Sequence, residues 1–142
     1  DKEIRTPRNK IYYHNDPKFR LKRQLRNGLN RAIKENRESQ MLKEYLGCSI
    51  NKFYQWIEFQ FYDGMNWENQ GRYWHIDHTL PICSFNFEDK DQINKCFNWV
   101  NLRPLKAEKN LSKEGKVILK EYLNQEIKSV FFKKSFMYYF IS

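Results

Sequence analysis

Two short β-like stretches in an otherwise helical sequence constrain the fold of this chain more than any other feature. Residues 73–78 (YWHIDH) and 99–103 (WVNLR) are rich in aromatic and β-branched residues, which favour strands, and we expect Pro104 to end the second stretch. The segments around them carry apolar residues at helical spacing, or turn-forming Gly, Asn and Asp. We therefore expect an α+β protein in which a short two-stranded hairpin is surrounded by helices.

Capping residues and apolar periodicity predict where the helices begin. Asp16 followed by Pro17 is typical of a helix start, because proline suits the first helical position. Ser49 can cap a later helix, and Asp89 with Gln92 resembles a capping box. Apolar residues every three or four positions then predict helices over residues 17–38, 40–46, 50–61, 90–98, 107–114 and 117–127.

The end of the chain is apolar. In the last predicted helix we expect these side chains to point inward: Ile118, Leu119, Tyr122 and Leu123. The tail over 130–141 is aromatic, so we expect it to pack on the core or to form an interface. The expected organisation is an arm over 1–15, a basic helical region over 16–66, a core over 67–116, and a C-terminal helix and tail over 117–142.

Composition excludes several classes of protein. The 142 residues include 11 Phe, 9 Tyr and 4 Trp, too many aromatic side chains for a disordered chain. No apolar run approaches the ~20 residues that cross a bilayer, so we expect no membrane span. The three cysteines contain no CxxC pair, which excludes a four-cysteine zinc site, and their odd number fits a reducing, intracellular compartment. No targeting segment is visible, although a chain that begins with Asp1 is expected to be a trimmed product.

The charge of the chain is unevenly distributed. Residues 1–46 carry 13 basic and 6 acidic side chains, residues 47–101 carry 4 and 7, and residues 102–142 carry 9 and 4. A basic surface suits a polyanion, most commonly nucleic acid. We therefore expect the helix over 17–38 to contact the DNA backbone through Lys22, Arg23, Arg26 and Arg31. The alternative is that these side chains form an ordinary solvated face.

Acidic, imidazole and amide side chains gather around the two β-like stretches. Asp77 and His78 end the first stretch, and Asn101 lies in the second. A carboxylate is a hard oxygen ligand that suits Mg²⁺, and an imidazole can accept a proton near neutral pH. If the strands and the helix over 107–114 fold back on one another, Asn110 lies beside Asp77 on the same metal. Taken singly, each residue also has a structural interpretation, as a strand-end cap or a buried histidine.

The string IDHTLP at 76–81, followed by NLRPLKAEKNLSK at 101–113, resembles the ββα-metal motif of HNH endonucleases. The resemblance covers residues 73–113 and is closest to HNH proteins of phages and large DNA viruses. It implies a ββα-metal core that binds one divalent ion, Mg²⁺ or Mn²⁺. It also implies hydrolysis of DNA phosphodiester bonds to 5′-phosphate and 3′-hydroxyl ends.

The resemblance implies a role for each matching residue. Asp77 and Asn110 match the metal ligands of the family. His78 matches the general base that activates water, and Asn101 matches the asparagine that braces the loop carrying this histidine. Asn110 stands where the last His or Asn of the family's motif binds the metal, so the pattern in this chain is H-N-N.

Other residues near the motif are candidates for contacts with DNA. We expect Arg103 and Lys113 to contact phosphates. His75 shares a strand face with Asp77 and is either an extra ligand or phosphate contact, or an exposed strand residue. Three aromatic side chains are candidates for base stacking, although most aromatic residues are expected in the core: Trp67, Tyr73 and Trp74.

Two other interpretations stay open. The chain is alternatively an HNH-like module that binds nucleic acid without cutting it, or an interaction domain of a larger assembly that docks through the tail SFMYYFIS at 135–142. One HNH site cuts one strand. A double-strand break therefore needs either a homodimer or two successive nicks.

Overall fold

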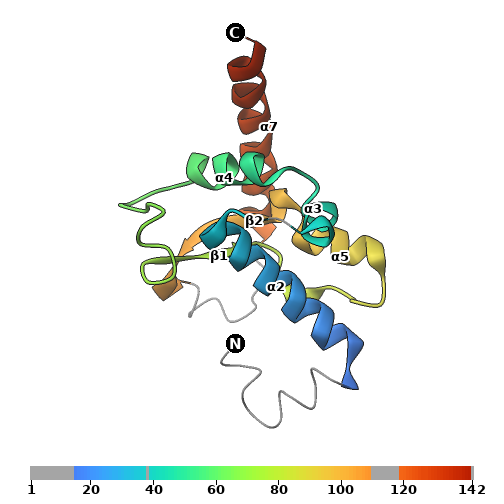
Figure 1. The fold of residues 1–142 in the computed structure, drawn as a ribbon. Helices are drawn as coiled ribbons and strands as arrows, with labels where there is room; N and C mark the ends of the chain where they lie inside the picture. Colours follow the sequence, from blue (N-terminus) through green and yellow to red (C-terminus); the bar gives the residue numbers. More distant parts are fainter. Residues whose placement is uncertain (1–14, 38, 110–118, 142) are drawn as a thin grey trace. The chain divides into compact units, whose positions relative to one another are not determined.

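The computed structural model describes residues 15–37, 39–109 and 119–141 of the chain (Figure 1). The chain divides into two compact units, Asp1–Glu44 and Tyr45–Ser142. The elements, in order, are α2 (Pro17–Glu35), α3 (Gln40–Leu46), α4 (Ile50–Phe59), β1 (Trp74–His78), the 3-10 turn η1 (Ile82–Ser84), α5 (Lys90–Phe97), the 3-10 turn η2 (Trp99–Asn101), β2 (Leu102–Lys106) and α7 (Leu119–Ile141). The described part is therefore mostly helical with one two-stranded antiparallel sheet, which confirms the α+β class in this coarse form.

Local capping explains the predicted helix starts. The Asp16 carboxylate accepts a hydrogen bond from the Lys18 backbone N–H at 2.9 Å, and Pro17 occupies the first helical position of α2. The side chains of Ser49 and Asp89 cap α4 and α5 in the same way. Helix α2 ends three residues earlier than the predicted residue 38, because Asn36 adopts a left-handed conformation with φ 52°.

The hairpin of β1 and β2 begins later than expected on its second strand. Asn98 caps the backbone N–H of Val100 at 3.0 Å, so residues 99–101 form a 3-10 turn instead of a strand. Strand β2 then runs through Pro104, so the prediction that this proline ends the strand is wrong. In a two-stranded sheet each strand has an open edge, where a missing N–H costs no ladder hydrogen bond.

The core of the second unit lies between α4, the hairpin and α7. Trp56 of α4 is fully buried and meets Phe132 of α7 with 5.3 Å between ring centroids. The indole N–H of Trp56 also donates to the Leu102 carbonyl at 2.9 Å, where β2 begins. Figure 1 shows α7 running past α4 and away from the hairpin. The start of β2 is thereby fixed against two helices.

Helix α7 buries a different face from the one predicted. Leu119 and Leu123 were expected to point inward, but they are 64% and 49% exposed. Among the side chains of α7 that the structure describes, up to residue 135, the buried ones are instead Gln125, Ser129 and Phe132. The amide of Gln125 donates to the carbonyls of Val100 and Leu102, which places a polar side chain at the packed surface. Ile118 lies outside the described residues.

The apolar tail continues α7 as far as Ile141. No helix of the described residues is both long enough and apolar enough to span a membrane. The helix expected over 107–114 is helical at residues 107–109, and the rest of it falls outside the described part of the chain. The helix that a ββα-metal motif would need as its third element falls mostly outside the described residues.

Candidate functional site

The last two residues of β1 point to opposite faces of the hairpin, because side chains alternate along a strand. Asp77 pairs in register with Arg103, and His78 pairs with Leu102. The Asp77 side chain is buried, whereas His78 is half-buried. The His78 ring meets the Phe97 ring edge-on, with 4.8 Å between centroids. A carboxylate and an imidazole thus occupy adjacent positions at the end of one strand, with their side chains directed to opposite faces of the hairpin.

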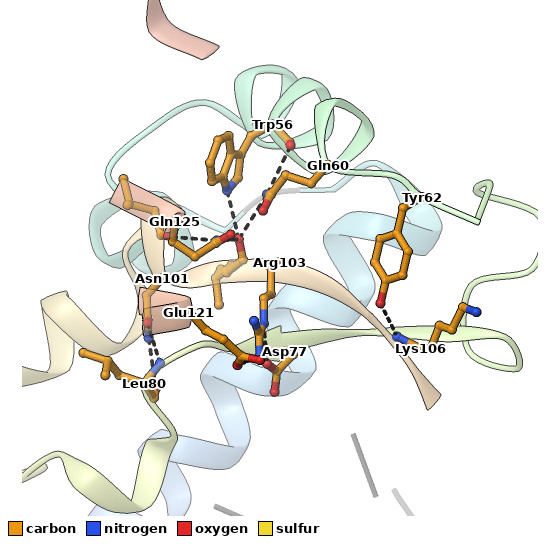
Figure 2. Close-up of polar contacts among 12 residues, drawn as sticks. Trp56, Gln60, Tyr62, Asp77, Leu80, Asn101, Arg103, Lys106, Glu121 and Gln125 are labelled. Carbon is orange, nitrogen blue, oxygen red and sulfur yellow. Dashed lines mark hydrogen bonds and ion pairs between the residues drawn. The ribbon is translucent and has the colours of Figure 1, made fainter. Parts of the chain in front are cut away.

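Arg103 joins two carboxylates, and we call this set of Asp77, Arg103 and Glu121 the Arg103 network. The Arg103 Nε atom donates to Asp77 Oδ2 at 2.9 Å, and its terminal nitrogen donates to Glu121 Oε2 at 2.8 Å (Figure 2). The Arg103 side chain is 12% exposed and that of Glu121, from α7, is 37% exposed. Two carboxylates and one guanidinium leave a net charge of −1 in this network.

Lys128 of α7 lies within the electrostatic field of the same groups. Its pKa is lowered, first by burial and then by the like charge of Arg103, while Glu121 acts in the opposite direction. Helix α7 therefore carries one acidic and one basic side chain whose charges act on Arg103.

Asn101 ties down the segment that follows His78, through contacts that we call the Asn101 network. Its side-chain oxygen accepts from the Leu80 N–H at 2.8 Å, and its amide donates to the Leu80 carbonyl at 3.1 Å (Figure 2). The same amide donates to the Cys96 carbonyl at 2.9 Å. The Thr79 N–H donates to the Asn101 backbone carbonyl at 2.8 Å. The side chain of one buried asparagine thus satisfies three backbone groups and joins the loop after β1 to the end of α5.

The described residues account for only part of the expected metal site. Asn110 and Lys113 lie outside them. No group of three or more His, Cys, Asp or Glu side chains that could hold a metal ion occurs within the described ranges. Asp77 supplies a buried carboxylate, and an amide oxygen from Asn110 would complete an all-oxygen pair, a donor set that suits Mg²⁺ or Mn²⁺. His75 is half-buried on β1 and pairs with Leu105.

The expected phosphate contacts differ in exposure. Arg26 and Arg31 on α2 are exposed, Lys22 is half-buried, and Arg23 is buried. Burial and the like charge of Arg26 lower the pKa of Arg23. Arg103 is engaged by two carboxylates and is largely covered. Among these residues, Arg26 and Arg31 are the best placed to meet a phosphate.

The aromatic candidates for base stacking belong mainly to the core. Trp74 is fully buried, so its prediction as a stacking platform is wrong. Trp67 packs against the Trp74 ring at 5.5 Å and donates its indole N–H to Glu58 at 2.6 Å. Tyr73 is 36% exposed, and its hydroxyl donates to the Asp63 carbonyl. The aromatic content of this region is explained by packing.

Sequence reasoning missed the contributions of α7 and α4. Glu121 and Gln125 reach the hairpin from α7, and Gln60, the residue directly after α4, donates to the Leu102 carbonyl at 3.4 Å. One signal was available, because the apolar residues of α7 do not gather on a single face of the helix. Such a helix must bury polar residues when it packs.

Comparisons with known proteins give relatives without an assigned activity. The chain is 45% identical over 127 residues to "Uncharacterized protein L426" of Acanthamoeba polyphaga mimivirus, a match covering 89% of this chain and 56% of that protein. It is 36% identical over 108 residues to "Uncharacterized protein L246" of the same virus, covering 76% of this chain and 47% of that protein. No family model and no solved structure matches the chain. The chain thus spans about half the length of the two mimivirus proteins it resembles.

Proposed function

We propose that this chain is an HNH-like, divalent-metal-dependent DNA endonuclease or nickase domain. The observation that carries the proposal is the arrangement at the end of β1, where Asp77 and His78 precede a loop that Asn101 holds by three hydrogen bonds, one to the Thr79 N–H and two to the N–H and carbonyl of Leu80. A general base and a metal ligand must keep fixed positions relative to the scissile phosphate. The Asn101 network supplies such a restraint directly after the proposed base.

In the proposed reaction, His78 accepts a proton from the water that attacks the phosphorus. Asp77, together with Asn110, would hold Mg²⁺ or Mn²⁺, which supplies electrostatic stabilisation of the charge that develops on the phosphate and on the leaving 3′ oxygen. The edge-on contact with Phe97 restricts rotation of the His78 ring. The proposed products carry 5′-phosphate and 3′-hydroxyl ends.

Binding of DNA is assigned mainly to charge. Residues 1–46 carry 13 basic and 6 acidic side chains, and Arg26 and Arg31 are exposed on α2. Contacts of this kind hold the phosphate backbone without reading the sequence. Affinity for DNA is then expected to fall steeply with salt, because each phosphate contact releases condensed counterions.

A supercoiled-plasmid assay tests the proposal. Wild-type protein is expected to nick DNA with Mg²⁺ or Mn²⁺ but not with EDTA, and His78→Ala is expected to lose nicking by about a hundredfold or more. Asn124→Ala, at an exposed position of α7 outside the proposed site, is the control and is expected to keep the activity of wild type. Equal cutting by His78→Ala and wild type would overturn the assignment of the base.

A non-catalytic nucleic-acid-binding module is the second candidate, and one observation favours it. Asp77 Oδ2 accepts a hydrogen bond from Arg103, as it would in a purely structural ion pair. Such a module would bind DNA equally well in EDTA and in Mg²⁺ and would leave the plasmid intact under both conditions. Retained binding without nicking would therefore select this candidate.

A further inference from the structure

We propose that Arg103 and Glu121 are positioning residues for the Asp77 carboxylate, and that Glu121 keeps the charge around Asp77 negative enough to hold a divalent cation. The inference rests on the proposed function, because it takes Asp77 as a metal ligand. It assigns a role in the site to α7, which contributes nothing to the HNH-like string at residues 76–113.

The first step is geometric. The Arg103 guanidinium donates through Nε to Asp77 and through a terminal nitrogen to Glu121, at 2.9 and 2.8 Å. A guanidinium is planar and its donors form a rigid fork, so fixing one side of the group orients the other. The orientation of the Asp77 carboxylate is therefore coupled to Glu121. A carboxylate has two oxygens and accepts from more than one partner, so a contact at Oδ2 is compatible with binding a cation.

The second step concerns charge. Asp77 and Arg103 alone form a neutral pair, which attracts a divalent cation weakly. Glu121 adds one negative charge to this pair from α7. Lys128 adds one positive charge on the same helix, within electrostatic range of Arg103 and Glu121, and therefore counteracts the charge of Glu121. Two side chains of one helix should therefore change cation affinity in opposite directions when each is neutralised.

Direct binding of Mn²⁺ to the full chain, without DNA, tests this inference. Loss of the free Mn²⁺ electron paramagnetic resonance signal on titration gives the Kd at low salt. Glu121→Gln is expected to weaken binding by roughly three- to tenfold, and Lys128→Gln to tighten it by roughly two- to threefold, the size expected of one charge several ångströms away in a partly exposed site. Glu126→Gln makes the same change of charge on an exposed position of α7 and should alter the Kd less than either.

The outcomes separate the inference from the proposed function. If Asp77→Asn abolishes Mn²⁺ binding while Glu121→Gln and Lys128→Gln bind as wild type does, the role of α7 is wrong and the metal site stands. A change of the Mn²⁺ Kd in the same direction in both Glu121→Gln and Lys128→Gln would also overturn the inference. Such a result would indicate that both substitutions disturb the structure, because an effect of charge must have opposite signs in the two variants. If Asp77→Asn binds Mn²⁺ as tightly as wild type, both the metal site and the inference fall.

Discussion

The Asn101 and Arg103 networks lie near each other in the sequence but differ in chemistry. Asn101 is neutral, buried and bonded to backbone groups of the segments beside the hairpin. Arg103 is charged and reaches a half-buried side chain on α7, which follows in the sequence. Neutral bonds to backbone hold the shape of a loop under all salt conditions, whereas ion pairs near the surface weaken as salt screens them. We infer that the first network fixes the path of the chain after His78 and the second sets the charge at Asp77.

Removing the Asn101 side chain should have the largest effect. Asn101→Ala leaves the Leu80 N–H and the carbonyls of Leu80 and Cys96 without this partner. The free energy of unfolding is expected to fall by about 2–4 kcal/mol, measured by urea denaturation. Asn124→Ala, at an exposed position of α7, should stay within about 0.5 kcal/mol. A loss below about 1 kcal/mol for Asn101→Ala would show that the loop does not depend on this side chain.

Removing the guanidinium at the centre of the Arg103 network should destabilise the protein less than Asn101→Ala does. Arg103→Met keeps much of the side-chain volume but leaves Asp77, which is buried, without its guanidinium. The free energy of unfolding is expected to fall by about 1–3 kcal/mol, because the buried carboxylate loses the opposite charge at 2.9 Å. The urea midpoint gives the measurement. If Arg103→Met lowers the free energy of unfolding more than Asn101→Ala does, the Arg103 network contributes more to stability than the Asn101 network, contrary to this prediction.

Gln125 offers a neutral contact from the helix that also carries Glu121. Gln125→Leu removes donors to the carbonyls of Val100 and Leu102, while the Leu102 carbonyl still accepts from Trp56. We expect a loss of about 1–2 kcal/mol that is the same at low and high salt, since no charge changes. A loss that depends on salt would contradict the assignment of α7 packing to neutral contacts.

Neutralising Glu121 should have the smallest effect on stability, and the dependence of this effect on salt should distinguish the Arg103 network from the Asn101 network. Glu121→Gln keeps a hydrogen-bonding side chain but removes one charge from an ion pair whose acidic partner is 37% exposed. We expect a loss of about 0.5 kcal/mol at low salt that disappears near about 1 M NaCl, where the Debye length is about 3 Å. Parallel urea titrations at the two salt concentrations give the measurement. A loss that persists at high salt would mean that packing, and not charge, accounts for the role of Glu121.

The predictable part of the fold depends on contacts between near neighbours in the sequence. Asp16, Ser49 and Asp89 each cap a helix through a backbone N–H two or three residues away. Residues 74–78 form β1 as their composition indicates, and Asp77 and His78 are adjacent in the chain, so their proximity needs no tertiary information. The order of these local elements is what the α+β prediction used.

Two errors arose where a local pattern competed with another contact. The stretch 99–103 looked like a strand, but the Asn98 side chain stabilises a tight turn and moves the strand to Leu102–Lys106. The exposed Leu119 and Leu123 looked like an inward-facing stripe, but α7 turns Gln125 and Phe132 to the core. Hydrophobic spacing finds a helix, but it does not decide which face a neighbouring element will cover.

The sequence by itself determined the helix starts, the first strand and the neighbouring acid and histidine, because caps, composition and adjacency act over a few residues. Only the tertiary structure decided the partners of Arg103. From its charge, Arg103 was predicted to contact a phosphate. In the structure its guanidinium instead pairs with Asp77 and with Glu121 of α7, which lies 18 residues further along the chain. Charge is a property of the residue, but whether it meets solvent or another side chain depends on which helix packs beside it.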